Sequence, residues 1–310
     1  MQQITDTVIM VRPVAFRMNE QTAVNNYFQE DIDLKNAEIN KKAQYEFDSF
    51  VAKLRGIGIN VLVIEDDKEM DTPDSIFPNN WISTHENGNI AIYPLYAENR
   101  RKERREEFFT KMETAGFAIN SVVDYTAAEE EDIFLEGTGS IVLDRVNEKA
   151  YCALSPRADE ELFIEFCEDF GYFPVVFTAF QTVSGERLPI YHTNVMMCLA
   201  EKFCVICLSS IDDKKERSVV IDHLRDSGKE IIAITEKQVA QFAGNMLQVR
   251  SKSGEKCLIM SNSAYKSLDQ NQIEAIEKYC EIVSSNIETI ETCGGGSARC
   301  MMAEVFLPKK

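Results

Sequence analysis

Pairs of hydrophobic runs separated by short polar turns recur along the chain. The runs are rich in β-branched and other apolar residues, and turns such as 86–89 (ENGN) or 253–254 (SG) join the two members of a pair. This pattern is typical of β-hairpins. We predict hairpins at 80–95 (NWISTHENGNIAIYPL), 138–154 (TGSIVLDRVNEKAYCAL), 194–210 (NVMMCLAEKFCVICLSS) and 245–261 (NMLQVRSKSGEKCLIMS).

A charged segment with helical spacing of its apolar residues follows each hairpin. These segments occupy residues 99–116, 158–171, 212–230 and 268–283, and their period predicts helices that cover one face of a sheet. Short strand-like pieces follow, for example 230–235 (EIIAIT) and 286–291 (NIETIE). Hairpin, helix and strand together form one module.

The modules repeat at a nearly constant interval. The residues that open successive hairpins, Asn80, Glu136, His192, Gly244 and Gly295, stand 51 to 56 residues apart, a period typical of propellers, solenoids and arrays. The fifth hairpin lacks a second strand at the C-terminus, and residues 5–13 (TDTVIMVRP) could supply it. We therefore predict a single α/β domain over 1–310, a five-module propeller with pseudo-fivefold symmetry closed by its terminal strands. The alternative is an ordinary α/β sheet without symmetry.

Composition narrows the range of partners. The chain has 33 Lys and Arg against 51 Asp and Glu, a formal charge of −18, which disfavours nucleic acid as a partner. A cationic or zwitterionic small molecule is more compatible. The N-terminal residues lack the pattern of a secretory signal, and no run of about 18 apolar residues suggests a membrane span. We expect a cytoplasmic protein with a small-molecule substrate and no membrane partner, and a homodimer is the oligomeric state we consider.

Nine scattered cysteines do not resemble a disulfide framework. The one close pair, Cys204 and Cys207, lies in an apolar strand-like run with no second pair at zinc-binding spacing. We therefore expect neither a metal nor a cofactor, and most thiols should be reduced and buried.

The hairpin entrances carry the candidate chemistry, because a ring of modules brings them together at one end of its axis. A cysteine nucleophile needs a partner that favours thiolate, since a free thiol has a pKa of about 8.5. Cys300, His192 and Glu136 stand at equivalent entrances and could provide nucleophile, acid/base and orienting carboxylate. A strand-capping role is the alternative for His192, whereas His85 and His223 fall in a turn and a helix.

These motifs resemble the guanidine-modifying (pentein) superfamily, which includes arginine deiminases, dimethylarginine dimethylaminohydrolases and amidinotransferases. The ending GGGSARCM resembles that of arginine and agmatine deiminases, and PDSIFPNN, ENRRKE and EGTGSIVLDR resemble segments of the dimethylarginine hydrolases. The resemblance implies a five-module α/β propeller and a site built from Cys, His and a carboxylate. It implies Cys300 as nucleophile, His192 as acid/base and Glu136 as the acid facing the substrate head group. It further implies substrate contacts from Asp74, Asn79, Asn80, Asn194, Arg100 and Arg145, the two arginines binding the α-carboxylate.

Two amides depart from the family pattern. Asn80 and Asn194 stand where members of the superfamily have acids. Carboxylates suit a cationic guanidinium, whereas an amide both donates and accepts hydrogen bonds and suits a neutral ureido group. We therefore expect a hydrolase that cleaves a C–N bond of an arginine-like amino acid through a covalent Cys300 intermediate, with citrulline preferred. The alternatives are an amidinotransferase, an arginine or dimethylarginine hydrolase, and a non-catalytic amino-acid-binding propeller.

Several residues also have plainer interpretations. Arg100 lies in a charged run that is usually a solvated helix face, Arg145 could be a hairpin-turn arginine, and Asp74 could only start a turn. Trp81 and several methionines are expected in the core or pocket wall. Three polar segments, 126–134, 158–163 and 184–189, are candidates for a lid over the pocket.

Overall fold

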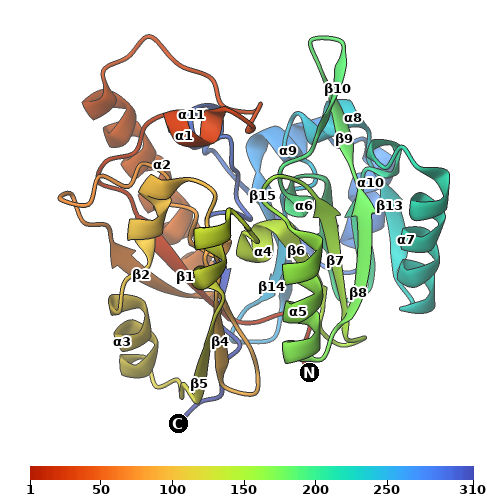
Figure 1. Cartoon of the computed structure of the whole chain (residues 1–310), viewed down its shortest axis with the longest axis horizontal. Coiled ribbons are helices and arrows are strands. Elements are labelled where there is room, and N and C mark those ends of the chain that lie inside the picture. The colour runs from red at the N-terminus through yellow and green to blue at the C-terminus, as the bar shows by residue number, and fades with distance from the viewer.

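Five small three-stranded sheets form the framework of the protein. The computed structural model describes residues 1–310, and Figure 1 shows the sheets with helices on their outer sides. In four of them an antiparallel pair is followed by a third, parallel strand that returns after a helical crossover. These sheets contain β3 (Ile82–Thr84), β4 (Asn89–Ile92) and β5 (Ser121–Asp124); β6 (Ile141–Asp144), β7 (Lys149–Leu154) and β8 (Phe173–Thr178); β11 (Met197–Leu199), β12 (Phe203–Ile206) and β13 (Glu230–Ala233); and β14 (Leu247–Arg250), β15 (Lys256–Ser261) and β16 (Glu281–Ser285).

The fifth sheet joins the two ends of the chain. Strand β1 (Thr7–Arg12) lies between β17 (Ala303–Glu304) and β2 (Asn60–Glu65). β1 pairs antiparallel with β17, with Val8 opposite Glu304, and parallel with β2. The pairing predicted between the N-terminal and C-terminal strands is therefore present. The sheets remain separate and none closes into a barrel, so the mixed α/β fold is established and the propeller stays a prediction.

The crossover helices begin close to where the sequence pattern places them. Asp159, Asp213 and Asp269 each accept a hydrogen bond from a backbone N–H of the helix they precede, which satisfies a donor that the first turn leaves unpaired. The predicted helix 99–116 is instead two pieces, because Arg104 between them is extended. The crossovers are α2 (Asn36–Gly56), η2 (Glu98–Glu103) with α3 (Glu107–Thr114), α5 (Glu160–Phe170), α7 (Lys214–Asp226) and α10 (Gln270–Glu277).

Short helical turns stand at the hairpin entrances and in the connections. The short elements are α1 (Glu20–Ala23), η1 (Pro78–Asn80), η3 (Thr126–Glu131), α4 (Gly137–Ser140), the hairpin of β9 (Phe180–Val183) and β10 (Glu186–Pro189), α6 (Thr193–Met196), η4 (Leu208–Ser210), α8 (Glu236–Val239), α9 (Asn262–Ser267) and α11 (Glu288–Gly294).

Residues 286–291, predicted as a strand, instead lie at the start of helix α11. The first turn of α11 is capped by a distant residue: the Glu46 carboxylate accepts hydrogen bonds from the backbone N–H groups of Thr289 and Ile290. The strand that this prediction misplaced is β16, just before it.

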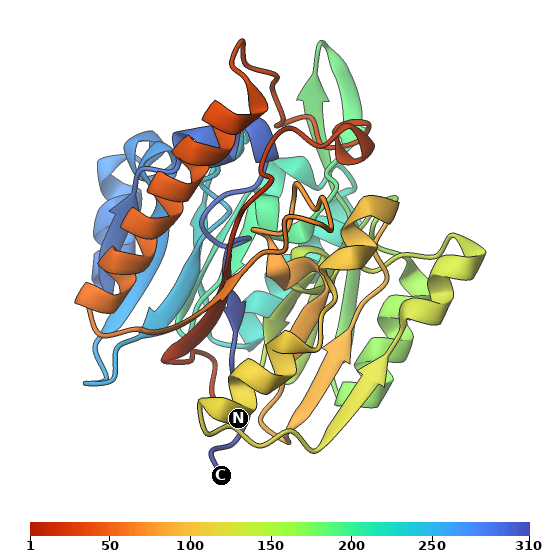
Figure 2. The same cartoon turned by 90° about the vertical axis from the view of Figure 1, so that its left-hand side faces the viewer.

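The apolar core lies between sheets and crossover helices in four clusters. Trp81 and the methionines at 197, 260, 301 and 302 are buried, as expected. All nine cysteines are free and buried. No helix has both the length and the apolar character needed to cross a membrane. Figure 2 shows the long helix α2 packed along one side of the molecule, with the N-terminal and C-terminal ends close together.

Candidate active site

The hairpin entrances converge on one buried site. Asn80 ends η1, Glu136 precedes α4, His192 precedes α6, and Cys300 precedes β17. Glu136, His192 and Cys300 are 0%, 2% and 3% exposed. The close approach depends on Gly139, because a Cβ there would lie 2.4 Å from Asn80 Nδ2 and 2.8 Å from His192 Nδ1. Side chains from separate modules thus meet around the turn of α4.

His192 and Glu136 form a buried pair. His192 Nε2 lies 2.7 Å from Glu136 Oε2, and Arg157 Nη1 lies 3.4 Å from the same oxygen. Burial opposes the charge on Glu136, but Arg157 and His192 outweigh it and lower the pKa of that carboxyl. Burial lowers the pKa of His192 to about 4, against the opposing effect of Glu136. The site therefore holds an ionised carboxylate beside a neutral imidazole at pH 7.

Two amides surround the sulfur of Cys300. Asn245 Nδ2 lies 3.2 Å from Cys300 Sγ, and Asn194 Nδ2 lies 3.6 Å from it. Asn245 Oδ1 also accepts hydrogen bonds from the backbone N–H groups of Arg299 and Cys300. The side chain of Asn245 thus fixes the backbone that carries the thiol and directs its amide nitrogen toward the sulfur.

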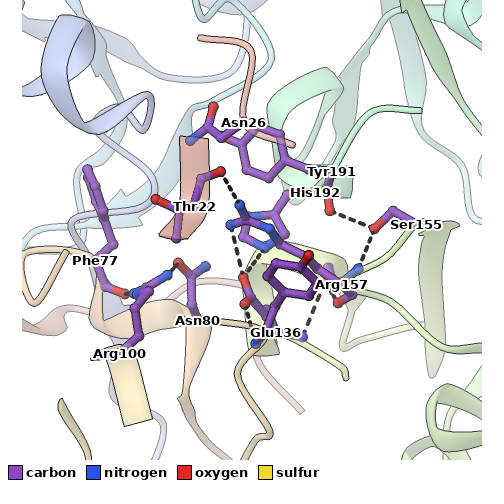
Figure 3. Close-up of polar contacts among 12 residues, drawn as sticks. Thr22, Asn26, Phe77, Asn80, Arg100, Glu136, Ser155, Arg157, Tyr191 and His192 are labelled. Carbon is purple, nitrogen blue, oxygen red and sulfur yellow. Dashed lines mark hydrogen bonds and ion pairs between the residues drawn. The ribbon is translucent and has the colours of Figure 1, made fainter. Parts of the chain in front are cut away.

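Arg100 holds Asn80 rather than facing the site as a free cation. Its Nη1 donates to Asn80 Oδ1 at 2.8 Å, and Nη2 donates to the Phe77 carbonyl at 3.1 Å (Figure 3). Nε and Nη2 also form a fork with Glu103 at 2.9 Å. The predicted role in binding the substrate carboxylate stays a prediction, which the engagement of these donors does not favour. Arg100 is also buried, so the solvated-face interpretation is wrong.

Asp74 and Asn79 lie beside this network. Asp74 Oδ2 accepts hydrogen bonds from Asn19 and Thr22, and burial raises the pKa of this carboxyl against the opposing charge of Arg100. The other oxygen of Asp74 and both polar atoms of the Asn79 side chain are buried without a partner. Unpaired buried groups are costly, so they are candidates for contacts with a bound molecule.

Arg145 lies away from these residues. It follows β6, whereas Glu136 precedes the turn that opens the same strand, and four strand residues span about 13 Å. Its guanidinium stacks over the Phe306 ring at 3.9 Å and donates to the Thr84 carbonyl at 3.4 Å. The predicted role of Arg145 in binding the substrate carboxylate stays a prediction, which this position does not favour.

Arg157 is the functional candidate that the sequence analysis missed. Its Nη2 donates to the Thr22 carbonyl at 2.9 Å, and its guanidinium lies over the Tyr191 ring (Figure 3). Its Nε donates to Asn25 Oδ1 at 2.9 Å. Arg157 follows β7, the second strand of its hairpin, which returns to the end where the first strand began. That return is the signal that could have identified it. Asn245 was noticed at a hairpin entrance but was not assigned a role.

Residues 19–30 cover the site. Asn26 Nδ2 donates to the Gly294 and Gly295 carbonyls, Gln29 Nε2 donates to that of Gly294, and the Glu30 N–H donates to Thr292. This cover segment, defined as residues 19–30, includes α1 and lies outside all three segments proposed as lids. The glycines before Cys300 make these contacts possible, since a Cβ on Gly295 would lie 2.6 Å from Asn26.

Comparisons with known proteins agree with this architecture. A family model described as N,N dimethylarginine dimethylhydrolase, eukaryotic, matches residues 12–307. No curated protein matches the chain. Among solved structures, apo ArgZ, an arginine dihydrolase from the ornithine-ammonia cycle in cyanobacteria, is similar with a TM-score of 0.73 and 15% identity over 98% of this chain and 41% of that one.

Shorter solved structures match over nearly their whole length. The N-terminal domain of an ArgZ mutant bound covalently to a reaction intermediate has a TM-score of 0.69 and 16% identity, over 97% of this chain and 99% of that one. A dimethylarginine dimethylaminohydrolase mutant, as an adduct with S-methyl-L-thiocitrulline, has a TM-score of 0.64 and 13% identity, over 97% and 99%. This chain thus spans about two fifths of ArgZ, and at these identities the structures show a shared fold.

Proposed function

The chain belongs to the dimethylarginine dimethylhydrolase family, a family of guanidino-group hydrolases, and from this premise we propose that it hydrolyses the ureido group of citrulline in preference to the guanidinium of arginine. Cys300 is the nucleophile, His192 the acid and base, and Glu136 the carboxylate that orients the imidazole. The proposal depends on which hydrogen-bonding atoms the buried site leaves free.

The orientation of the Asn80 amide is the observation that carries this preference. Arg100 has only donors, so Asn80 must turn its oxygen toward Arg100, where the separation is 2.8 Å. Asn80 Nδ2 is thereby left as a buried donor without a partner, next to the His192 ring. A ureido oxygen can accept from this donor. A guanidinium carries only donors and would leave it unpaired, at a cost of about 1–3 kcal/mol.

Asn194 supports the same preference. Its Nδ2 lies 3.2 Å from the Thr138 carbonyl, and its Oδ1 lies 3.3 Å from Asn245 Nδ2. A carboxylate at either amide position would add a buried negative charge, which a neutral ureido group could not balance. The amides therefore suit a neutral head group better than a cationic one.

The proposed reaction uses the neutral imidazole twice. His192 takes the thiol proton as Cys300 Sγ attacks the ureido carbon, and the resulting imidazolium gives that proton to the departing nitrogen as its C–N bond breaks. Water then attacks the thiocarbamate carbon, His192 takes a proton from the water, and the C–S bond breaks to restore the thiol. The carbamic acid product separates into carbon dioxide and an amine, so the complete reaction yields ornithine, ammonia and carbon dioxide.

Arg157 is our candidate for the substrate α-carboxylate. Two of its donor atoms bond the cover segment, at Asn25 and Thr22, and they become free when that segment moves away. A guanidinium fork suits a carboxylate. Asp74 and Asn79, with their unpaired polar atoms, would complete the contacts with the bound amino acid.

A substrate comparison tests the proposal. Purified protein would be incubated separately with citrulline, arginine and N,N-dimethylarginine, and ornithine and ammonia would be measured. Adding glycine to the arginine reaction would reveal amidino transfer. Turnover of arginine or dimethylarginine without citrulline would exclude the proposed preference.

Covalent labelling separates an enzyme from a non-catalytic binding protein. We expect a haloacetamidine to label Cys300, and the rate to fall on His192→Ala because the base that activates the thiol is lost. Equal labelling in both forms would indicate a thiol without this partner.

We also propose that residues 1–310 form one five-module propeller domain. The five sheets share one pairing pattern, and β3 contacts β17, β6 contacts β11, and β11 contacts β14. These contacts and the pairing of the terminal strands support a ring. A homodimer remains a prediction, which sedimentation would test.

A further inference from the structure

One buried cation has no counter-charge. Five cationic side chains of Lys and Arg are buried, and four have a carboxylate nearby: Arg100 with Glu103 at 2.9 Å, Arg157 with Glu136 at 3.4 Å, Lys229 with Asp144 at 3.1 Å and Arg299 with Glu304 at 3.0 Å. The fifth, Arg145, is 4% exposed and has no carboxylate oxygen within 4.0 Å. An arginine side chain remains charged, and a buried unpaired charge is unfavourable.

Neutral groups stabilise the buried charge of Arg145 only in part. The Phe306 ring lies 3.9 Å from the guanidinium, and the Thr84 carbonyl accepts one hydrogen bond at 3.4 Å. The hydroxyl of Tyr172 lies close to Arg145, and burial raises the pKa of that hydroxyl against the opposing influence of the guanidinium. Tyr172 therefore keeps its proton at pH 7 and supplies a dipole, with no negative charge.

The unpaired guanidinium lines a small cavity at the end of β6 remote from Glu136. The cavity has a volume of about 110 Å³, which excludes a large ligand. The His85 ring, whose centroid lies 4.0 Å from that of the tilted Phe170 ring, forms part of its wall, and burial keeps His85 neutral by lowering its pKa. The lining residues are Met1, Gln2, His85, Glu86, Asn87, Arg145, Phe170 and Tyr172.

Glu86 is the only carboxylate in this lining, and other groups engage it. Its Oε1 accepts a hydrogen bond from the Gln2 N–H at 2.5 Å, and its Oε2 lies 3.7 Å from the N-terminal ammonium. The charge of Glu86 is thus offset by the chain terminus rather than by Arg145. A nearby carboxylate still disfavours a multiply charged ligand, so a monoanion fits best.

We propose that this cavity binds a small planar monoanion, a carboxylate or bicarbonate, through the guanidinium of Arg145. A planar pair of oxygens matches the guanidinium fork, the volume fits a ligand of a few atoms, and binding supplies the missing counter-charge. The site lies outside the catalytic residues and does not depend on the proposed reaction.

Calorimetric titration of the full chain with sodium formate and, separately, sodium bicarbonate tests this proposal at constant ionic strength in a buffer with a bulky anion. We expect one site per chain with a dissociation constant on the order of 1 mM, since so small a ligand makes few contacts. If only formate gives binding heat, the cavity is a carboxylate site, and if only bicarbonate does, it is a bicarbonate site. If both give binding heat, the cavity recognises the planar pair of oxygens that the two anions share.

Two variants locate the binding. Arg145→Met should weaken it at least tenfold, whereas the exposed-arginine control Arg225→Met should leave it unchanged. Thermal unfolding without ligand shows whether Arg145→Met folds. If it does not, Tyr172→Phe, which removes a hydroxyl from the cavity wall, should weaken binding several-fold. Absence of binding in the wild-type chain, or undiminished binding in folded Arg145→Met or in Tyr172→Phe, would overturn the proposal.

Discussion

In the proposed function, Asn80 carries the choice of head group because Arg100 orients its amide. The Arg100 fork with Glu103 fixes the guanidinium, and the guanidinium fixes Asn80 Oδ1. The unpaired donor, Nδ2, follows from this arrangement. Specificity at a site with buried polar groups is strong, because the wrong ligand leaves a group without a partner.

Substitution of Asn80 by Asp should reverse this preference in part. Asn80→Asp replaces the free donor with an acceptor, so we expect kcat/KM for citrulline to fall roughly 10- to 100-fold, equivalent to about 1–3 kcal/mol. The ratio of arginine to citrulline turnover should rise. Steady-state kinetics with both substrates measures this, and the exposed substitution Asn286→Asp is the control. An unchanged ratio in Asn80→Asp would show that the Asn80 amide does not set the substrate preference.

The pH dependence should report the neutral state of His192. Because burial lowers the pKa of His192 to about 4, the imidazole is in its basic form at pH 7, and kcat/KM should decline only as the pH falls through about 4. A free histidine would give a decline near about 6.5. Assays across this range, with activity rechecked after return to pH 7, separate titration from unfolding. An acid limb at 6.5 would contradict the assignment.

The same shift links pH to stability. The pKa of His192 is lower in the folded chain than in the unfolded one, so the unfolded chain binds the extra proton first. The contribution of His192 to the free energy of unfolding is therefore fully present above about pH 6.5. About 3 kcal/mol of it is lost progressively as the pH falls to about 4. Urea unfolding at several pH values should show a smaller loss in His192→Gln than in the wild-type chain.

The sequence could place the residues that open the first strand of each hairpin. The repeat brings Asn80, Glu136, His192 and Cys300 to equivalent positions, and the structure places them around one site. Arg145 and Arg157 show the limit of this reasoning. Arg145 follows the first strand and therefore lies at the far end, whereas Arg157 follows the second strand and lies at the near end. To decide which arginine lies near the site, one must know at which residue each strand ends.

At the scale of elements, we propose that the cover segment controls access to the thiol. It is tied to the loop before Cys300 by Asn26 and Gln29 and to the site by Arg157. Because the site residues are almost fully buried, a substrate needs part of the structure to open, and we expect this segment to do so. Such contacts join residues more than a hundred positions apart, so local sequence patterns could not predict them.

Weakening the closed state should expose Cys300. Asn26→Ala removes two hydrogen bonds to the Gly294 and Gly295 carbonyls, so we expect alkylation of Cys300 by iodoacetamide to accelerate roughly 3- to 10-fold. Mass spectrometry of the peptide containing Cys300 measures the rate, with Asn286→Ala as the surface control. Equal rates in the two variants would mean that another element limits access.

Element boundaries show a second limit of the sequence analysis. Hydrophobic period located most crossover helices, but it predicted a strand at 286–291, where Thr289 and Ile290 lie in the first turn of α11 instead. The cap from Glu46 comes from α2, distant in sequence. Tertiary contacts of this kind override local propensity.

At the scale of the whole molecule, the terminal strands make the fold depend on both ends of the chain. Residues after β17 also contact the module that contains β3, β4 and β5: the Ala118 N–H donates to the Pro308 carbonyl, and Thr84 Oγ1 accepts a hydrogen bond from the Phe306 N–H. The paired termini remove two exposed strand edges.

Truncation after Met302 tests this dependence. We expect removal of 303–310 to abolish cooperative thermal unfolding, because β1 loses its antiparallel partner and buried Val305, Phe306 and Leu307 are lost from the core. Circular dichroism would monitor the transition, and removal of the exposed Lys310 alone is the control. Cooperative unfolding of the truncated chain at the wild-type midpoint would show that closure contributes little.

The most direct test of the central claim is a comparison of kcat/KM for citrulline, arginine and N,N-dimethylarginine with the purified wild-type chain. We predict that citrulline releases ornithine and ammonia at a kcat/KM at least tenfold above that for either guanidine, because only the ureido oxygen can accept from the unpaired donor of Asn80. A higher kcat/KM for arginine or dimethylarginine would contradict it.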